Sequence, residues 1–292
     1  MTCDNQPGIR SWSAISATLL ILCSATGHAQ SDAGEWIQLF NGSDLDDWVV
    51  KIRGYPAGDN YADTFRVADG LLAVVYDGYG DYEDRFGHLF FRQPFSHYRL
   101  RVEYRFTGEQ VPKAPQWALR NSGVMIHSQD PYTMPTGQDF PISLEAQFLG
   151  GLSDGNARPT ANMCSPGTHI RYHGSLEETH CIDSTSPTFD GDQWVTVELL
   201  VLGSEKVIHY VNGEAVIEYG NLVVGGEEVN GYRPEMKQDG EPLASGYIAL
   251  QSESHPIQFR RVELLNLKGC MDPAAVNFRP YFVESDPDSC TF

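Results

Sequence analysis

The sequence has no uninterrupted apolar segment long enough to cross a bilayer. A spanning helix needs roughly 20 consecutive apolar residues, whereas the apolar stretch from Ala14 to Cys23 is short and broken by polar residues. Arg10 precedes this stretch and the small-x-small site Gly27-His28-Ala29 follows it, a pattern typical of an export signal. We predict a signal peptide over residues 1–29, a mature start near Gln30 and a periplasmic or extracellular location. A membrane anchor is the competing interpretation.

Positive charge is also scarce. The chain has 20 Lys and Arg against 39 Asp and Glu, a formal net charge of −19, and no basic run. A polyanion such as nucleic acid, or an anionic membrane, would be repelled by this charge. The composition therefore argues against these partners, whereas neutral sugars and divalent cations remain compatible. The sequence carries no signal for an oligomeric state.

No two cysteines form a CxxC pair, which argues against a zinc site. Two of the six cysteines lie in the predicted leader, and the other four would meet an oxidising compartment, where disulfides form. Four cysteines allow three pairings. We predict pairing between nearest neighbours, Cys164 with Cys181 and Cys270 with Cys290, which closes two short loops.

Helical spacing of apolar residues is missing between Trp36 and Leu267, where period-two alternation recurs between clusters of Gly, Pro, Asn and Asp. The clearest strand is His97 to Phe106, with apolar and charged residues on opposite faces. Asn212-Gly213 joins two further strand-like runs and predicts a type I′ hairpin. About a dozen such strands indicate an all-β domain of two packed sheets or a closed barrel. Long loops are expected over residues 76–87, 111–121, 129–140 and 150–192.

Five short motifs occur in order along the chain: Leu39 to Trp48 (LFNGSDLDDW), Asn121 to Val124 (NSGV), Leu144 to Gln147 (LEAQ), Val211 to Gly213 (VNG), and Gly246 to Gln251 (GYIALQ) with Ile257 to Arg260 (IQFR). Together they resemble the 3-keto-disaccharide hydrolase domain, over roughly Glu35 to Leu267. This resemblance implies a concanavalin A-like lectin/glucanase fold, a two-sheet antiparallel jelly-roll sandwich.

These observations divide the chain into three parts. We predict a signal peptide over 1–29, the sandwich domain over 30–268 and a cysteine-closed extension over 269–292. The last part is similar to short "C.DP.A.N" extensions at the ends of exported bacterial proteins, and we interpret it as a stapled cap.

Three strands are expected to present polar side chains on one face. Residues two apart in a strand share a face, so the apolar face formed by Leu144 and Ala146 directs Glu145 and Gln147 to the opposite side. The same argument, applied to the strands near residues 121–128 and 246–253, predicts a carbohydrate-directed patch of Asn121, His127, Glu145, Gln147, Gln251 and Glu253. The alternative is an ordinary solvated sheet face.

The resemblance implies chemistry on glycosides whose C3 hydroxyl has been oxidised to a ketone. Such a ketone acidifies the C2 proton, so that a base can remove it and the C1 substituent can leave before water adds. Glu145 or His127 is the candidate base, and His255 is a candidate acid or metal ligand. Asn121, Gln147, Gln251, Glu253 and His255 are the candidate substrate-binding residues. A divalent metal ion could also polarise the ketone, with His127, Glu145 and Glu253 as ligands.

Two other functions compete with this one. An ordinary glycosidase would use two carboxylates, for which Glu145 and Glu253 form the best pair, and a carbohydrate-binding module would need no catalytic group. Loop aromatics that could stack on a sugar ring are Tyr79, Tyr82, Trp117, Tyr132 and Tyr172. We expect His169, His173 and His180, in the cysteine loop, to be structural.

Overall fold

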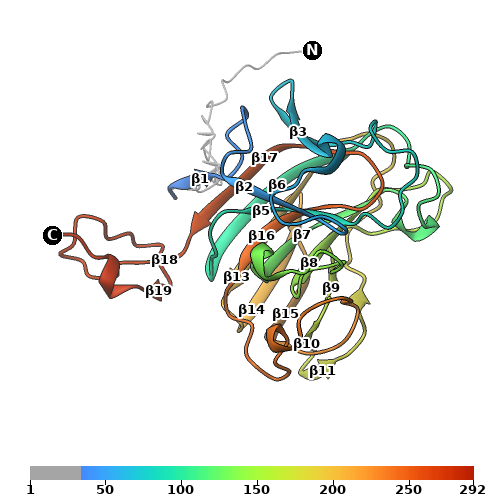
Figure 1. Ribbon diagram of the computed structural model, residues 1–292. Helices are drawn as coiled ribbons and strands as arrows, with labels where there is room; N and C mark the ends of the chain where they lie inside the picture. Colours follow the sequence, from blue (N-terminus) through green and yellow to red (C-terminus); the bar gives the residue numbers. More distant parts are fainter. Residues whose placement is uncertain (1–33) are drawn as a thin grey trace, which may run out of the picture. The chain divides into compact units, whose positions relative to one another are not determined.

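A computed structural model describes residues 34–292, and within them the chain forms two antiparallel sheets packed face to face (Figure 1). The predicted signal peptide and mature start lie outside the described residues. The ten-stranded sheet contains, in spatial order, β11 (Ser175–Glu177), β10 (Thr168–Tyr172), β15 (Glu214–Val224), β14 (Lys206–Val211), β13 (Val195–Leu202), β6 (His97–Phe106), β17 (Ile257–Asn266), β4 (Leu71–Val74) and β3 (Phe65–Ala68), with β1 (Trp36–Gln38) also paired to β17. The predicted all-β sandwich is therefore confirmed, and a closed barrel is not formed.

The seven-stranded sheet carries the candidate site. Its spatial order is β12 (Cys181–Ile182), β9 (Asn162–Cys164), β8 (Leu144–Leu149), β7 (Asn121–Ser128), β16 (Tyr247–Ser252), β5 (Gly87–Phe91) and β2 (Trp48–Ile52). Neighbours in space are distant in sequence, since β16 lies between β7 and β5. Residues more than a hundred positions apart thus meet on one face.

Strand β6 forms as its alternation predicts. Leu100, Val102 and Tyr104 are buried between the sheets, whereas Arg101 faces outward and pairs with Glu198 and Glu263, each at 2.6 Å. The Asn212-Gly213 hairpin between β14 and β15 is also confirmed. Both residues have positive φ, 49° and 91°, as a type I′ turn requires.

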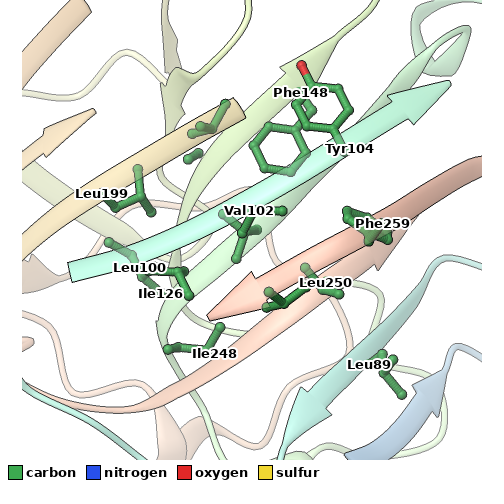
Figure 2. Packing of buried hydrophobic residues seen from close by; sticks show 14 of the residues in the cluster. Leu89, Leu100, Val102, Tyr104, Ile126, Phe148, Leu199, Ile248, Leu250 and Phe259 are labelled. Carbon is green, nitrogen blue, oxygen red and sulfur yellow. The ribbon is translucent and has the colours of Figure 1, made fainter. Parts of the chain in front are cut away.

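The core lies between the two sheets. Tyr104 of β6 and Phe148 of β8 stack across the interface with ring centroids 4.2 Å apart (Figure 2). Ile126, Ile248 and Leu250 of the seven-stranded sheet are fully buried in the same cluster. Burial of each such side chain stabilises the fold by about 1.5–3 kcal/mol. This packing fixes which face of β7, β8 and β16 is left for the site.

The segment predicted as one long loop, 150–192, contains four short strands, β9 to β12. They have two to five residues each, too few for alternation to reveal. Strand β2 was missed for a related reason: three consecutive residues, Val50, Lys51 and Ile52, are buried, so the strand lacks a polar face. The other three expected loops contain only turns and short 3-10 segments, such as η2 (Gln116–Ala118) and η3 (Pro131–Thr133).

Both predicted disulfides form. Cys164–Cys181 joins directly paired residues of β9 and β12, and Cys270–Cys290 closes the C-terminal segment. In that segment β18 (Lys268–Gly269) pairs in parallel with β19 (Glu284–Ser285). Within residues 34–292, no helix has the length and apolar character needed to cross a membrane.

Candidate functional site

The outer face of the seven-stranded sheet holds a cavity of about 280 Å³. Four of the predicted residues line it, Asn121, Glu145, Gln147 and Glu253. The remaining lining residues are Trp117, Phe140, Cys164, Pro166, His180, Cys181 and Glu228. Ligand pockets usually measure about 300–1,000 Å³, so this cavity matches one small ring rather than a polymer.

This face is not the solvated surface of the alternative interpretation. Glu145, Glu253 and Asn121 are 6%, 4% and 3% exposed. Met134, from the loop after η3, packs with Met125 and Phe90 over the sheet. Buried polar groups need hydrogen-bond partners. Buried atoms on this face that lack a partner in the described chain are therefore candidates for contact with a ligand.

Glu145 lies across a glycine. It projects from β8, and Gly123 stands opposite Gln147 on β7. A Cβ added to Gly123 would come within 2.8 Å of the Glu145 Cγ and 2.9 Å of its Cδ. The Glu145 carboxyl can occupy this position because Gly123 has no side chain.

The Glu145 and Glu253 carboxyls interact electrostatically. Burial raises the pKa of Glu145 to about 8. Burial first, and then the charge of Glu145, raise the pKa of Glu253 well above its usual value. Among the described residues that line the cavity there is no Lys or Arg to offset either charge. Burial therefore favours the protonated form of both carboxyls, and Glu145 is the one whose pKa, about 8, lies closer to neutral pH.

Two amides, those of Asn121 and Gln147, also line the cavity. Asn121 Oδ1 is buried and lacks a hydrogen-bond partner among the described residues. Gln147 Oε1 accepts a hydrogen bond from Asn162 Nδ2 at 3.1 Å, which fixes the orientation of its amide. Both groups suit the hydroxyls of a sugar.

Gln251, on β16, is not among the residues that line the cavity. It is 1% exposed, and neither its Nε2 nor its Oε1 has a hydrogen-bond partner in the described part of the chain. On β5, His88 is directly opposite it, and Lys51 on β2 is opposite His88. Sequence reasoning missed both His88 and Lys51, although two polar residues inside the apolar runs of β5 and β2 could have drawn attention to them.

The structure corrects the placement of His127. Ile126 and His127 both oppose Ile248, because the β7–β16 register shifts at this point. This β-bulge gives His127 a φ of 48° and turns its ring to the inner side of the sheet. Its Nε2 lies 3.0 Å from the carbonyl oxygen of Gly203 and its ring packs on Tyr98. His127 therefore does not meet Glu145, and strict alternation failed there.

His255 also lies apart from the cavity lining. Its ring packs against Phe106 of the other sheet with centroids 5.7 Å apart. Burial, and then the nearby Arg120 charge, lower its pKa to about 4. The ring is therefore neutral at ordinary pH and is not placed as the predicted acid.

Of the predicted aromatics, Trp117 alone is among the described cavity residues. It is 55% exposed and stacks on Phe86, with centroids 6.0 Å apart. Tyr79 and Tyr82 are buried in the core cluster, and Tyr132 is exposed elsewhere. The fifth, Tyr172, packs on His173.

His180 and the Cys164–Cys181 disulfide form one wall of the cavity. In the described chain, these three residues are the one cluster of potential ligands within 4.8 Å. Its two sulfurs are already joined to each other, so they are not thiolate ligands. The predicted metal ligands His127, Glu145 and Glu253 are not one set either, because the His127 ring faces away.

The chain is thus a two-sheet β-sandwich with one small cavity among its described surfaces that is lined by carboxyl and amide side chains. More specifically, residues 35–265 match the model of the 3-keto-alpha-glucoside-1,2-lyase-like domain, and the chain belongs to this family. The family resemblance predicted from the sequence is thus confirmed. No curated protein matches the chain.

Solved structures similar to this chain include three bacterial proteins. A candidate glycosyl hydrolase of Parabacteroides distasonis ATCC 8503 is 16% identical, with 80% of this chain and 100% of that chain covered and a TM-score of 0.47. Carbohydrate binding module CBM66 of Bacillus subtilis is 9% identical, with 64% and 89% covered and a TM-score of 0.38. LamAcat of Zobellia galactanivorans is 9% identical, with 75% and 91% covered and a TM-score of 0.41.

Proposed function

We propose that this chain is an exported hydrolase that cleaves 3-keto-glycosides by elimination followed by hydration. The observation that carries the proposal is the buried Glu145–Glu253 pair, at a cavity without a basic lining residue in the described chain. Membership of the lyase-like family supports the same reaction class.

The reaction needs one base and one acid. Glu145, once ionised, takes the C2 proton, and the C–H electrons form an enolate with its negative charge on the C3 oxygen. As the C3 carbonyl re-forms, a C1–C2 double bond is made and the C1–O bond breaks. Glu253 then protonates the departing oxygen. Water adds to C1 of the C1–C2 double bond, giving its proton to Glu253, while Glu145 returns a proton to C2, so both carboxyls regain their starting states. A base with a raised pKa is well matched to carbon acidity, which favours Glu145 in this role.

The cavity walls suit one sugar ring. Trp117 and Phe140 offer apolar faces, whereas Asn121 and Gln147 offer hydrogen-bonding groups. Aromatic faces beside directed polar groups are a common way to bind a sugar. We therefore assign substrate binding to these residues and proton transfer to the two carboxyls.

Turnover of 4-nitrophenyl 3-keto-α-glucoside, followed by nitrophenolate release, tests the proposal. We expect release from the keto substrate and none from the unoxidised glucoside. Cleavage of the unoxidised glucoside would instead indicate an ordinary two-carboxylate glycosidase. Binding of glycans without cleavage of either substrate would indicate a carbohydrate-binding module.

A further inference from the structure

Polar side chains form a row across neighbouring strands of the seven-stranded sheet. Gln251 of β16 is paired with His88 of β5, and His88 is paired with Lys51 of β2. On the other side of β16, Leu250 is paired with Val124 of β7, so Gln251 is next to Gly123, and the Glu145 carboxyl fills the space above Gly123. Strands lie about 4.8 Å apart, so Lys51 is roughly 10 Å from Gln251 at the backbone. The row thus runs from the proposed base to a cation.

The row is buried and poor in partners. His88 is fully buried, and neither of its ring nitrogens is hydrogen-bonded within residues 34–292; both amide atoms of Gln251 are also unpaired there. Buried polar groups in native proteins nearly always have a partner, and leaving one unpaired costs about 1–3 kcal/mol. The two unpaired amide atoms of Gln251 therefore leave hydrogen-bonding capacity for a bound group.

Lys51 gives the row its charge. It is 1% exposed, and its Nζ donates to the carbonyl oxygens of Ile52 at 3.1 Å and Thr136 at 3.5 Å, with no carboxylate partner among the described residues. Burial lowers its pKa to about 8, so it remains mostly protonated at neutral pH. Burial and the Lys51 charge lower the pKa of His88 to about 3, which keeps that ring neutral.

We propose that Gln251 donates a hydrogen bond to the keto oxygen of the sugar, and that His88 and Lys51 act as positioning residues that hold the negative charge developing there. The inference rests on the proposed function. Its chemistry follows from the row: removal of the C2 proton by Glu145 places negative charge on the C3 oxygen, and donors next to a buried cation stabilise such an oxyanion. The carboxyl, the amide donor and the cation follow one another along the row, in the order that proton removal at C2 and charge development on the C3 oxygen require.

Phe140 separates His88 from the cavity. Its ring lies 5.9 Å from the His88 ring, centroid to centroid, and also lines the cavity. Gln251 is therefore the member assigned to contact the substrate, because it lies between the positions of Glu145 and His88. His88 and Lys51 act through Gln251 and do not contact the substrate.

Three near-isosteric variants test the inference: Gln251→Met, His88→Phe and Lys51→Met. Removal of one oxyanion donor lowers kcat by about 10²–10³-fold, which we expect for Gln251→Met with KM nearly unchanged. Smaller losses of kcat are expected for the other two. The melting temperatures should not fall, since each change removes a buried group that lacks a full set of partners.

A C2-deuterated substrate separates this role from a structural one. Weaker enolate stabilisation makes C2 deprotonation slower, so the isotope effect on kcat should exceed that of the wild type in the row variants. Lys206→Met, which removes an exposed lysine paired with Glu218 on the other sheet, is the matched control and should leave both values unchanged.

Wild-type kcat and isotope effects in folded Gln251→Met and His88→Phe would overturn the inference while leaving the proposed function intact. If one of the three variants Gln251→Met, His88→Phe and Lys51→Met does not fold, the same comparison is made with the remaining two. A wild-type protein that does not cleave the keto substrate would overturn the proposed function, and this inference with it.

Discussion

The Glu145 carboxyl occupies the space that a side chain at Gly123 would take. The two residues lie on adjacent strands, β8 and β7, two positions out of direct register, because Glu145 is paired with Met125 and Gly123 with Gln147. A strand glycine often marks a close approach by another group, and here that group is the proposed base. The position of the Glu145 carboxyl therefore depends on Gly123, which has no side chain and no functional group.

Replacement of Gly123 by alanine should therefore displace the carboxyl while leaving both sheets formed. A misplacement of about 1 Å can reduce turnover about 100-fold, and we expect a loss of that order in kcat. Gly80→Ala is the control, because a Cβ there meets nothing within 4 Å. Equal activity of the two variants would show that the carboxyl position is not critical.

Glu145→Gln should abolish measurable turnover of the keto-glucoside. Loss of a general base lowers rates by about 10²–10⁴-fold, and glutamine keeps the size of the side chain. Circular dichroism should remain that of the wild type. Unchanged turnover would remove Glu145 from the mechanism.

The pH dependence of turnover should follow the carboxyl pair. Since the pKa of Glu145 is raised to about 8, kcat/KM should rise as pH increases toward about 8. Glu253 must stay protonated, so the rate should fall again at higher pH. In Glu253→Gln the falling limb should retain only the part that follows loss of the Lys51 charge, whose pKa is about 8. A falling limb identical to that of the wild type would assign the acid to another group.

The free energy of unfolding should decrease over the pH range in which kcat/KM increases. The folded pKa of Glu145, about 8, exceeds the ordinary value of 4.5, so the folded state binds more protons between these values. Stability from this group is present below about pH 4.5 and is lost as pH rises to about 8, by up to about 1.4 kcal/mol per pH unit. Urea unfolding should show a steeper decline in this window for the wild type than for Glu145→Gln. Parallel curves would contradict the raised pKa.

The two disulfides should differ in their effect on the site. Each closes a loop whose cross-link stabilises the fold by about 3 kcal/mol on the chain-entropy model, and their sequence separations are similar, 17 and 20 residues. Replacing Cys164 and Cys181 by serine should raise KM, because that bond forms a cavity wall. The same change at Cys270 and Cys290 should reduce stability alone. A KM that rises equally in both variants would show that the wall is not a local feature.

Much of the architecture could be predicted from local pattern. The alternation of β6, the Asn212-Gly213 turn and the family motifs each report on contacts close in sequence. Glu145, Gln147 and Glu253 were placed on a common face because their strands keep strict alternation through the site. Lys51 and His88 could not be placed in this way, since their partner Gln251 is more than 160 positions away and the strand order that joins them depends on tertiary packing.

The one-residue bulge at Ile126 and His127 divides β7 into two lengths with opposite parity. Before the bulge, Asn121 and Gly123 lie on the face of the sheet that carries Glu145, whereas the ring of His127, within the bulge, packs on Tyr98 of the other sheet. Deletion of one residue at this point would restore regular alternation, so that the residues after it would continue the pattern that places every second side chain on the side of Glu145. The bulge therefore ends the set of odd-numbered β7 residues on the side of Glu145, and it does so through the backbone, whatever side chains those residues carry.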